Sequence, residues 1–499
     1  MENKQNAERE HLQEQDASLE YAVRLAKVEA MKALGIDPWP QQKEVSSTCH
    51  GAINNFEKVP ESYEYTVAGR VMAVRLHGKT AFVHIQDNSG RIQVYIRQDI
   101  IGDTLFEQFK DFVDVGDIIW VKGPLFKTKT GEITLRVTEY TLLSKCLHPL
   151  PEKFHGLADI ETIYRQRYLD LITNQESRER FKKRSAIIRL MRDYFDDHGF
   201  MEVETPMLHP IPGGAAAKPF STHHNALDTD FYLRIAPELY LKRLVIGGFE
   251  RVYEINRNFR NEGISTRHNP EFTMAEFYVA HKDYRFMMDF IEQLLQYIAE
   301  RVNQTRTVNY GAMTIDLSKP FERISMQDAV VKHGGIPASD LAPETIDTTI
   351  KKHHIQIDSK VSWGYKLLAL FEELVEKKLV NPTFVTDYPI EISPLTKRDP
   401  NNTVVVPRFE LFIGGMEVAN GYNELNDPFD QAARFRQQAA AREIGDQEAH
   451  YYDADYVLAL EHGLPPTVGA GIGIDRLTML LTNTTSIKDV ILFPALKKR

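Results

Sequence analysis

The N-terminal part of the chain has an amphipathic pattern. The segment LEYAVRLAKVEAMKALGI, residues 19–36, follows a polar start over residues 1–18 and carries apolar residues at helical spacing. The apolar positions are Leu19, Val23, Ala26, Ala30 and Leu34. Gly35 and Pro38 are residue types that end helices. The pattern predicts one amphipathic helix followed by a loop.

Beyond this helix the period changes from about 3.6 to two. Five short alternating segments follow one another, separated by turns that contain Gly, Asn and Asp: YTVAGRVMAVR, AFVHIQD, RIQVYIR, DIIWVKG and EITLRVTEY. Alternation of this kind is typical of half-buried strands. Five such strands in one short block predict a small OB-fold β-barrel.

The remainder of the chain mixes both patterns. Helical periodicity returns in residues 178–200 and 283–302, and strand-like runs lie between and after them. These strand-like runs are FYLRIAPEL, ERVYEINRNFR, EFTMAEFYVA, PTFVTDYPIEI and PRFELFIGGMEVANGY. The sequence predicts an α+β multidomain protein. Its expected divisions are an N-terminal helix and polar extension at 1–60, the barrel at 61–147, a linker at 148–175, and a catalytic domain at 176–499 with a helical insertion near 330–380.

Composition narrows the class of protein. With 42% hydrophobic and 26% charged residues the chain is globular in type, and its formal charge of −10 argues against general nucleic-acid binding. The barrel segment has equal numbers of basic and acidic residues, so it could still carry a local basic face. Two cysteines without metal-ligand spacing, no signal peptide and no long apolar run predict a cytoplasmic protein with no membrane span.

Three motifs carry more specific information: HGFMEVETPMLHP, NRNFRNEGISTRHNPEFTMAEFY and GAGIGIDRLTMLL. In this order they resemble the signature motifs of class II aminoacyl-tRNA synthetases, and with the barrel the resemblance extends over roughly residues 20–499. The details are similar to lysyl-tRNA synthetases. The resemblance implies a catalytic domain built on an antiparallel β-sheet flanked by helices, and a homodimer interface at the first motif.

The implied reaction is activation of L-lysine with ATP to lysyl-adenylate, followed by transfer of lysine to the 3′ end of tRNA(Lys). A carboxylate that attacks a phosphate brings two anions together, and a planar cation that contacts both lowers the barrier. Arg260 resembles the family arginine in this role. The resemblance also assigns Glu262 to the adenine amino group, Phe272 to the adenine ring, and His268 and Asn269 to the nucleotide. From the residues alone, a hairpin whose charges merely face water stays open.

The third motif contributes Arg476, which the resemblance places at the γ-phosphate and adenine as a second catalytic cation. Its glycines could suggest a dinucleotide-binding fold, but no strand–helix–strand unit follows before Arg499. Glu410 and Glu417 resemble the family's Mg²⁺ ligands, and Glu410 also an ATP contact. Seven residues apart, they would point to opposite faces of one flat strand unless a bulge at the Gly-Gly pair 414–415 realigned them.

A lysine ammonium removed from water needs carboxylate partners, because an unpaired buried charge is costly. The resemblance assigns the α-amino group to Glu238 and the ε-ammonium to Glu276 and Glu424. The full set implied for lysine is Gly214, Glu238, Glu276, Tyr278, Asn420, Tyr422 and Glu424. Aspartyl and asparaginyl enzymes need a different pocket, so this set favours a cationic side chain.

The barrel also has candidate functional residues. Phe82 and Gln93 lie on neighbouring predicted strands and could stack on a base and read its edge. They resemble anticodon-reading residues, as does Glu132, with Arg75 nearby for phosphate. From the pattern alone, Phe82 could equally be a core residue.

Alternative functions stay open at this point. One is a same-fold aspartyl or asparaginyl enzyme, and another is an enzyme that attaches lysine to a protein, although such relatives lack the barrel. A third is a non-catalytic nucleic-acid-binding protein. The same site could also make diadenosine polyphosphates, by attack of ATP on the adenylate.

Overall fold

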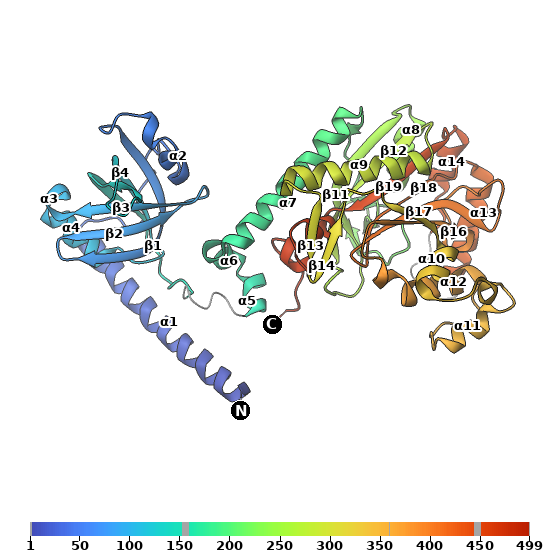
Figure 1. The fold of residues 1–499 in the computed structure, drawn as a ribbon, viewed down its shortest axis with the longest axis horizontal. Helices are drawn as coiled ribbons and strands as arrows, with labels where there is room; N and C mark the ends of the chain where they lie inside the picture. The colour runs from blue at the N-terminus through green and yellow to red at the C-terminus, as the bar shows by residue number, and fades with distance from the viewer. Residues whose placement is uncertain (1, 152–158, 359, 444–450, 499) are drawn as a thin grey trace. The chain divides into compact units, whose positions relative to one another are not determined.

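The computed structural model describes residues 2–151, 159–358, 360–443 and 451–498. The chain divides into two compact units, residues 1–158 and 159–499, and Figure 1 labels the helices and strands of each. Each unit has a hydrophobic core of its own. Among the described residues, no helix is both long and apolar enough to cross a bilayer.

The first unit contains a β-barrel. Its strands are β1 (Glu64–His77), β2 (Thr80–Gln86), β3 (Arg91–Arg97), β4 (Ile118–Lys127), β5 (Ile133–Arg136) and β6 (Glu139–Ser144). They pair in the order β1-β2-β3-β5-β4-β6, and an additional β1–β4 pairing closes the sheet. The predicted alternation is confirmed, since Ala81, Val83 and Ile85 are fully buried whereas Phe82 and His84 face outward.

The fifth expected strand is in fact two strands. EITLRVTEY forms β5 and the start of β6, and both pair with β4. The break falls where the chain crosses β4 at Gly123, since a Cβ there would lie 1.8 Å from the Arg136 carbonyl oxygen. Helices α3 (Gln98–Ile101) and α4 (Asp103–Phe112) connect β3 to β4 and were not anticipated from the sequence.

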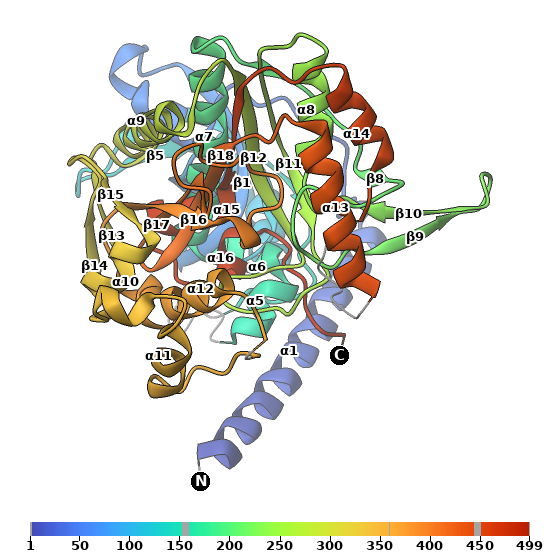
Figure 2. The ribbon, with the colours of Figure 1, turned by 90° about the vertical axis from the view of Figure 1, so that its right-hand side faces the viewer.

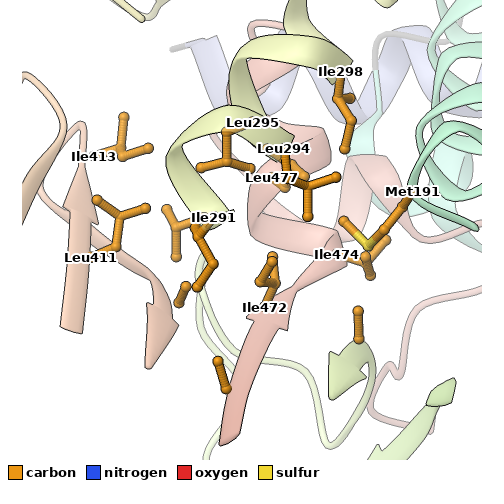
Figure 3. Packing of buried hydrophobic residues seen from close by; sticks show 14 of the residues in the cluster. Met191, Ile291, Leu294, Leu295, Ile298, Leu411, Ile413, Ile472, Ile474 and Leu477 are labelled. Carbon is orange, nitrogen blue, oxygen red and sulfur yellow. The ribbon is translucent and has the colours of Figure 1, made fainter. Parts of the chain in front are cut away.

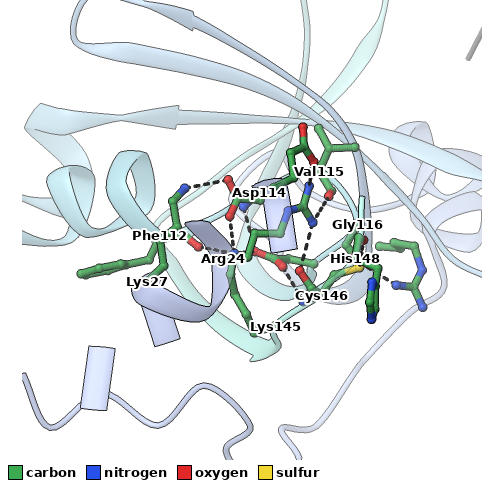
Figure 4. Close-up of polar contacts among 12 residues, drawn as sticks. Arg24, Lys27, Phe112, Asp114, Val115, Gly116, Lys145, Cys146 and His148 are labelled. Carbon is green, nitrogen blue, oxygen red and sulfur yellow. Dashed lines mark hydrogen bonds and ion pairs between the residues drawn. The ribbon is translucent and has the colours of Figure 1, made fainter. Parts of the chain in front are cut away.

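Helix α1 (Glu2–Ala33) includes the polar start, and α2 (Cys49–Asn54) follows it. The predicted helix is present, but its buried face differs from the apolar positions of the pattern: Leu19 and Val23 are 67% and 52% exposed, whereas Arg24 and Val28 are buried. Polar contacts explain the difference, as Figure 4 shows: Arg24 donates to the carbonyls of Val115 (3.1 Å) and Cys146 (3.0 Å). A buried arginine that satisfies two barrel carbonyls fixes the rotation of the helix more strongly than exposed aliphatic residues can.

The second unit is built on an eight-stranded sheet of order β15-β16-β17-β18-β19-β12-β11-β7. The central strands are antiparallel, and only the edge pairs β15–β16 and β11–β7 are parallel. The strands are β7 (Met201–Glu202), β11 (Arg251–Phe259), β12 (Glu271–Ala280), β15 (Glu322–Ser325), β16 (Thr383–Pro389), β17 (Val405–Ile413), β18 (Met416–Asn423) and β19 (Thr467–Gly473).

Three helices cover one face of this sheet: α7 (Gln175–Asp197), α9 (Tyr284–Asn303) and α15 (Ile474–Leu481). Figure 3 shows Ile291 and Leu295 of α9 packed toward Leu411 of β17, with Met191 of α7 beside Ile474. Burial of these aliphatic side chains stabilises the layer by roughly 1.5–3 kcal/mol each. The opposite face of the sheet is therefore left for the functional site.

The other elements surround this core. The helices are α5 (Ile160–Arg165), α6 (Arg167–Thr173), α8 (Glu238–Ile246), α10 (Met326–Gly334), α11 (Ile346–Lys352), α12 (Trp363–Leu374), α13 (Pro428–Glu443), α14 (Ala454–Glu461) and α16 (Ile487–Val490). The short strands are β8 (Leu208–His209), β9 (Ser221–His224), β10 (Thr229–Leu233), β13 (Thr307–Tyr310) and β14 (Met313–Asp316). The β9–β10 hairpin projects from the unit in Figure 2.

Two sequence segments differ in detail from their expected structure, whereas helices α10, α11 and α12 lie in the region of the expected helical insertion. Helices α5 and α6 lie in the stretch expected as a linker. FYLRIAPEL is a strand only to Leu233, and its end, from Glu238, starts helix α8. Glu238 therefore occupies the first turn of a helix.

Candidate active site

A cavity of about 390 Å³ lies on the face of the sheet that the three covering helices leave free. Its walls come from β12, β17, β18, β19, α8 and the segment that joins β11 to β12. Every residue expected to contact ATP, a metal ion or lysine lines it: Gly214, Glu238, Arg260, Glu262, His268, Asn269, Phe272, Glu276, Tyr278, Glu410, Glu417, Asn420, Tyr422, Glu424 and Arg476. The fold thus brings together residues that lie up to 262 positions apart.

Strand alternation explains part of this convergence. On β12, Ala275 and Phe277 point into the core, so Phe272, Glu276 and Tyr278 share the cavity face. The neighbouring strand β19 places Gly471 opposite Glu276 and Gly469 opposite Tyr278. A Cβ on Gly469 would lie 2.3 Å from the Tyr278 ring. The spaced glycines of the third motif therefore clear the cavity floor, and β19 continues directly into α15.

Arg260 is a half-buried cation with spare bonding capacity. Its guanidinium lies 5.1 Å from the centre of the Phe272 ring, and its buried Nε has no hydrogen-bond partner among the described residues. Burial lowers the pKa of Arg260, although the nearby Glu262 opposes this. A guanidinium that forms no ion pair with a described carboxylate is suited to an anionic ligand.

Arg476 is more firmly held. Its Nη1 donates to the Glu417 carbonyl (2.7 Å) and carboxylate (3.1 Å), and its Nη2 lies 3.3 Å from Nε2 of His268. Burial, followed by the charge of Arg476, lowers the pKa of His268, so this imidazole is neutral at pH 7 and can accept from the arginine. Asn269 uses its amide internally, on the Glu271 carbonyl and the Ala495 amide.

Glu410 and Glu417 lie on the two strands of one hairpin, so the expectation drawn from a single flat strand was wrong. Gly414 and Gly415 form the turn at positive φ, and Glu417 pairs with Phe412, which shares a face with Glu410 two residues away. The strands do contain a bulge, but it is at Val418. The two carboxylates reach one face because the chain reverses at the glycines.

The environment of these carboxylates fits a cation. Burial raises the pKa of Glu410 to about 7, and the charge of Glu417 adds to this, while Arg408 opposes it through a 2.5 Å contact. A divalent ion would relieve the repulsion between two such oxygen donors. No group of three or more His, Cys, Asp or Glu side chains is arranged around a common point within the described ranges. Any metal ion here would need further oxygen ligands from a bound substrate or from water.

The far end of the cavity is acidic, and behind its wall lies one cation that was not anticipated from the sequence. Lys242 is fully buried, with Nζ 2.6 Å from Oε1 of Glu238 and in contact with Glu424. Glu276 has no ion-pair partner among the described residues and accepts a 2.7 Å bond from the Tyr278 hydroxyl. Lys242 stands four residues after Glu238, a spacing that could have suggested the pair from the sequence.

The remaining predicted residues shape this end. Tyr422 donates to Glu238 (2.7 Å), and Asn420 accepts from Arg408 (3.3 Å). Gly214 has φ +88°, and a Cβ there would lie 2.9 Å from that of Glu238. The pocket wall therefore requires glycine at this position. Arg408 and Arg267 also line the cavity and were not anticipated.

The acidity of Glu276 predicts how ligand binding depends on pH. Burial raises its pKa to about 8, and the charge of Glu238 adds to this, so Glu276 is largely protonated in the unliganded protein below pH 8. An ammonium ligand prefers the carboxylate, so its Kd should fall by up to about tenfold for each pH unit between 6 and 8 and then level off. Calorimetric titration of lysine without ATP checks this pH dependence of Kd, and Glu276→Gln should remove most of the slope.

By the same linkage, Glu276 stabilises the fold most below its unfolded pKa of 4.5, and that contribution is lost as the pH rises through 8.

The barrel presents a polar and aromatic face. Phe82 faces outward and stacks on Tyr95, with ring centres 4.5 Å apart, so it is not a core residue. Gln93 is positioned by Glu132 (2.8 Å) and Thr134 (2.9 Å) on the same face. Arg75, which is exposed, pairs with Phe82 on the adjacent strand. Tyr95 and His84, which also lie on this face, were missed.

Comparison with known families agrees with this architecture. Residues 159–497 match the family of class II tRNA synthetases (D, K and N), and residues 65–143 match the OB-fold nucleic acid binding domain family. The fold and the site thus define the class: a class II aminoacyl-tRNA ligase with an attached OB-fold domain.

Similar individual proteins specify the family further. The chain is 52% identical over 478 residues to a lysine–tRNA ligase of Carboxydothermus hydrogenoformans, covering 96% of this chain and 98% of that protein. It is 50% identical to one of Magnetococcus marinus (98% and 99% covered) and 57% identical to one of Legionella pneumophila (87% of each). The chain belongs to the lysine–tRNA ligase family.

Proposed function

We propose that this chain activates L-lysine with ATP, with release of pyrophosphate, and transfers the lysyl group to the 3′ end of tRNA(Lys) for protein synthesis. The observation that carries the substrate assignment is the unneutralised Glu276 at the acidic end of the cavity. A side-chain ammonium supplies the charge that this carboxylate lacks. Aspartate would place a carboxylate there instead, and asparagine would leave Glu276 without a cation.

The two ends of the cavity give the substrates an orientation. Lysine lies with its carboxylate toward Arg260, its α-amino group near Glu238 and Gly214, and its ε-ammonium toward Glu276 and Glu424. The adenine ring lies on Phe272 with its amino group toward Glu262, while His268 and Arg476 contact the phosphates. Asn269 supports the loop, since its amide is already engaged.

Catalysis then requires no side-chain nucleophile. The substrate carboxylate attacks the α-phosphate and forms the mixed anhydride, and pyrophosphate leaves. The terminal ribose hydroxyl of tRNA next attacks the lysyl carbonyl, and AMP leaves. Arg260 reduces the repulsion between the two anions, and the walls hold the reacting atoms together.

Glu410 and Glu417 would hold Mg²⁺ together with the bound triphosphate. When bound, it neutralises phosphate charge. Arg408 keeps Glu410 oriented, and Arg476 keeps Glu417 oriented. These two arginines thereby set the carboxylate geometry before ATP arrives.

The decisive experiment is amino-acid-dependent exchange of pyrophosphate into ATP, with each of the twenty amino acids offered separately and no tRNA present. We expect exchange with lysine alone. Exchange with aspartate or asparagine would keep the fold and overturn the pocket assignment. No exchange with any amino acid would favour the non-catalytic alternative.

We propose that the outward face of the barrel binds the anticodon through Phe82, Gln93, Glu132 and Arg75. Since a base stacked on an aromatic ring contributes about 1–3 kcal/mol, Phe82→Ala should raise the KM for tRNA(Lys) roughly 5- to 150-fold. Pyrophosphate exchange should not change. Aminoacylation kinetics measure the first quantity, and Tyr63→Ala is a matched control, because Tyr63 precedes the opposite end of β1. Equal effects of the two substitutions would contradict the assignment.

Three further proposals concern the assembly and its setting. A homodimer at the first motif is supported by Met201, Leu208 and Phe249, exposed residues on or near the β7 edge of the sheet, and sedimentation equilibrium tests it. Action in the cytoplasm is in keeping with two free cysteines. We also propose diadenosine polyphosphates as a side product. Their accumulation in a mixture of protein, lysine and ATP without tRNA tests this.

A further inference from the structure

The buried lysine at the acidic end of the cavity has an unusual set of neighbours. Lys242 Nζ contacts Glu238 from its own helix, α8, and Glu424 from the segment after β18. The rings of Tyr422 and Tyr456 lie 5.7 and 5.9 Å from the ammonium. The side chain of Lys242 is 0% exposed. Both carboxylates that it touches line the cavity, but Lys242 itself does not.

Lys242 therefore acts on the cavity from behind its wall. Glu238 receives Lys242 and Tyr422 at the same oxygen, Oε1, and has no donor on Oε2 among the described residues. Glu424 faces Lys242 through Oε2, while its Oε1 points toward Gly469, which also lines the cavity. One oxygen of each carboxylate is held by the protein, and the other stays available to a ligand.

The charges at this end can be counted. Glu238, Glu276 and Glu424 supply three carboxylates and Lys242 one ammonium, which leaves two negative charges when all are ionised. Free lysine brings two ammonium groups, and its carboxylate lies at the Arg260 end. Substrate and pocket thus balance. Without Lys242 the side chains of Glu238 and Glu424 would lie close together with no cation of the protein between them, and like charges at such a distance repel.

We propose that Lys242 is a positioning residue for substrate recognition, which orients Glu238 and Glu424 and supplies a positive charge between them, so that the pocket matches an amino acid with two ammonium groups. This inference rests on the proposed lysine activation. A merely structural salt bridge within α8 would not need Glu424, which lies 182 residues farther along the chain.

The test uses lysine-dependent pyrophosphate exchange by the full-length chain. Lys242→Met keeps most of the volume and removes the charge, so the KM for lysine should rise at least tenfold, with the KM for ATP within twofold of wild type. The KM for lysine of Lys242→Arg should lie between those of the wild type and Lys242→Met. Lys145→Met is the matched control. Lys145, in the barrel unit, is equally buried and also pairs with two carboxylates, those of Asp114 and Asp117. This control should change the melting temperature without changing the KM for lysine.

Chemical rescue separates charge from packing. In Lys242→Ala, n-propylammonium can occupy the vacated space, so it should lower the KM for lysine, whereas in the wild type it should only compete with lysine and raise that KM. 1-Propanol, which has similar size and no charge, should not rescue.

The inference is overturned if folded Lys242→Met keeps the wild-type KM for lysine, or if propanol rescues Lys242→Ala as well as propylammonium does. If Lys242→Met and Lys242→Ala do not fold, an Arg variant with the lysine KM of the wild type and a lowered melting temperature would also overturn it. Exchange by the wild type in the same assay distinguishes failure of this inference from failure of the proposed function. Absence of lysine-dependent exchange in the wild type would refute the proposed function itself.

Discussion

Replacing Arg260 with Gln should lower the rate of lysine-dependent pyrophosphate exchange on the order of 100- to 1000-fold. Loss of one preorganised group that stabilises developing charge typically costs this much, and Arg260 is the cavity cation that has no carboxylate partner among the described residues. The effect should fall mainly on kcat, because Arg260 neutralises the attacking carboxylate and the α-phosphate together. Steady-state exchange kinetics measure it.

A control on β11, the strand that directly precedes Arg260, makes the result specific. Arg257→Gln removes an exposed guanidinium from β11 that pairs with Glu271 and does not line the cavity. Its exchange rate should stay within about twofold of wild type, as is usual for surface pairs. If Arg260→Gln is no slower than Arg257→Gln while both stay folded, Arg260 does not take part in the reaction.

Replacing Glu276 with Gln should raise the KM for lysine far more than the KM for ATP. Removal of one partner from a buried charge pair costs about 2–5 kcal/mol, which corresponds to roughly 30-fold to several thousand-fold. The amide keeps the shape of the side chain but cannot neutralise the ε-ammonium. The lysine and ATP dependence of exchange, measured separately, check the prediction.

Glu271→Gln is the matched control for this substitution. It removes a carboxylate from the start of the same strand, where Glu271 is paired with Arg257 outside the cavity. Both KM values should stay near wild type. Equal losses of lysine and ATP affinity in Glu276→Gln would indicate that Glu276 supports the sheet and does not select the substrate.

The sequence was sufficient for the architecture. Period-two alternation identified the barrel strands, because each has one buried and one solvent-facing side. The motifs, read as a resemblance, gave the synthetase class and a set of residues that all line one cavity. Alternation on β12 alone would place Phe272, Glu276 and Tyr278 on one face.

Two features that differ from the sequence-based expectation are set by contacts between residues far apart in the chain. The rotation of α1 depends on carbonyls of Val115 and Cys146, about 100 residues away in the chain, and not on its own apolar stripe. The shared face of Glu410 and Glu417 depends on the turn at Gly414 and Gly415, which makes one segment into two strands.

The sequence by itself therefore determined most of the strands, the long helices, the class of fold and the chemical types in the site, since these follow from local periodicity and motif order. Only the tertiary structure decided which charges are already neutralised. Lys242 pairs with Glu238 and Glu424 from behind the wall, whereas Glu276 has no cationic partner within the part of the chain that the structure describes. Coulombic pairing falls off with distance in space and not in sequence, so the charge balance of a pocket exists only once the chain has folded.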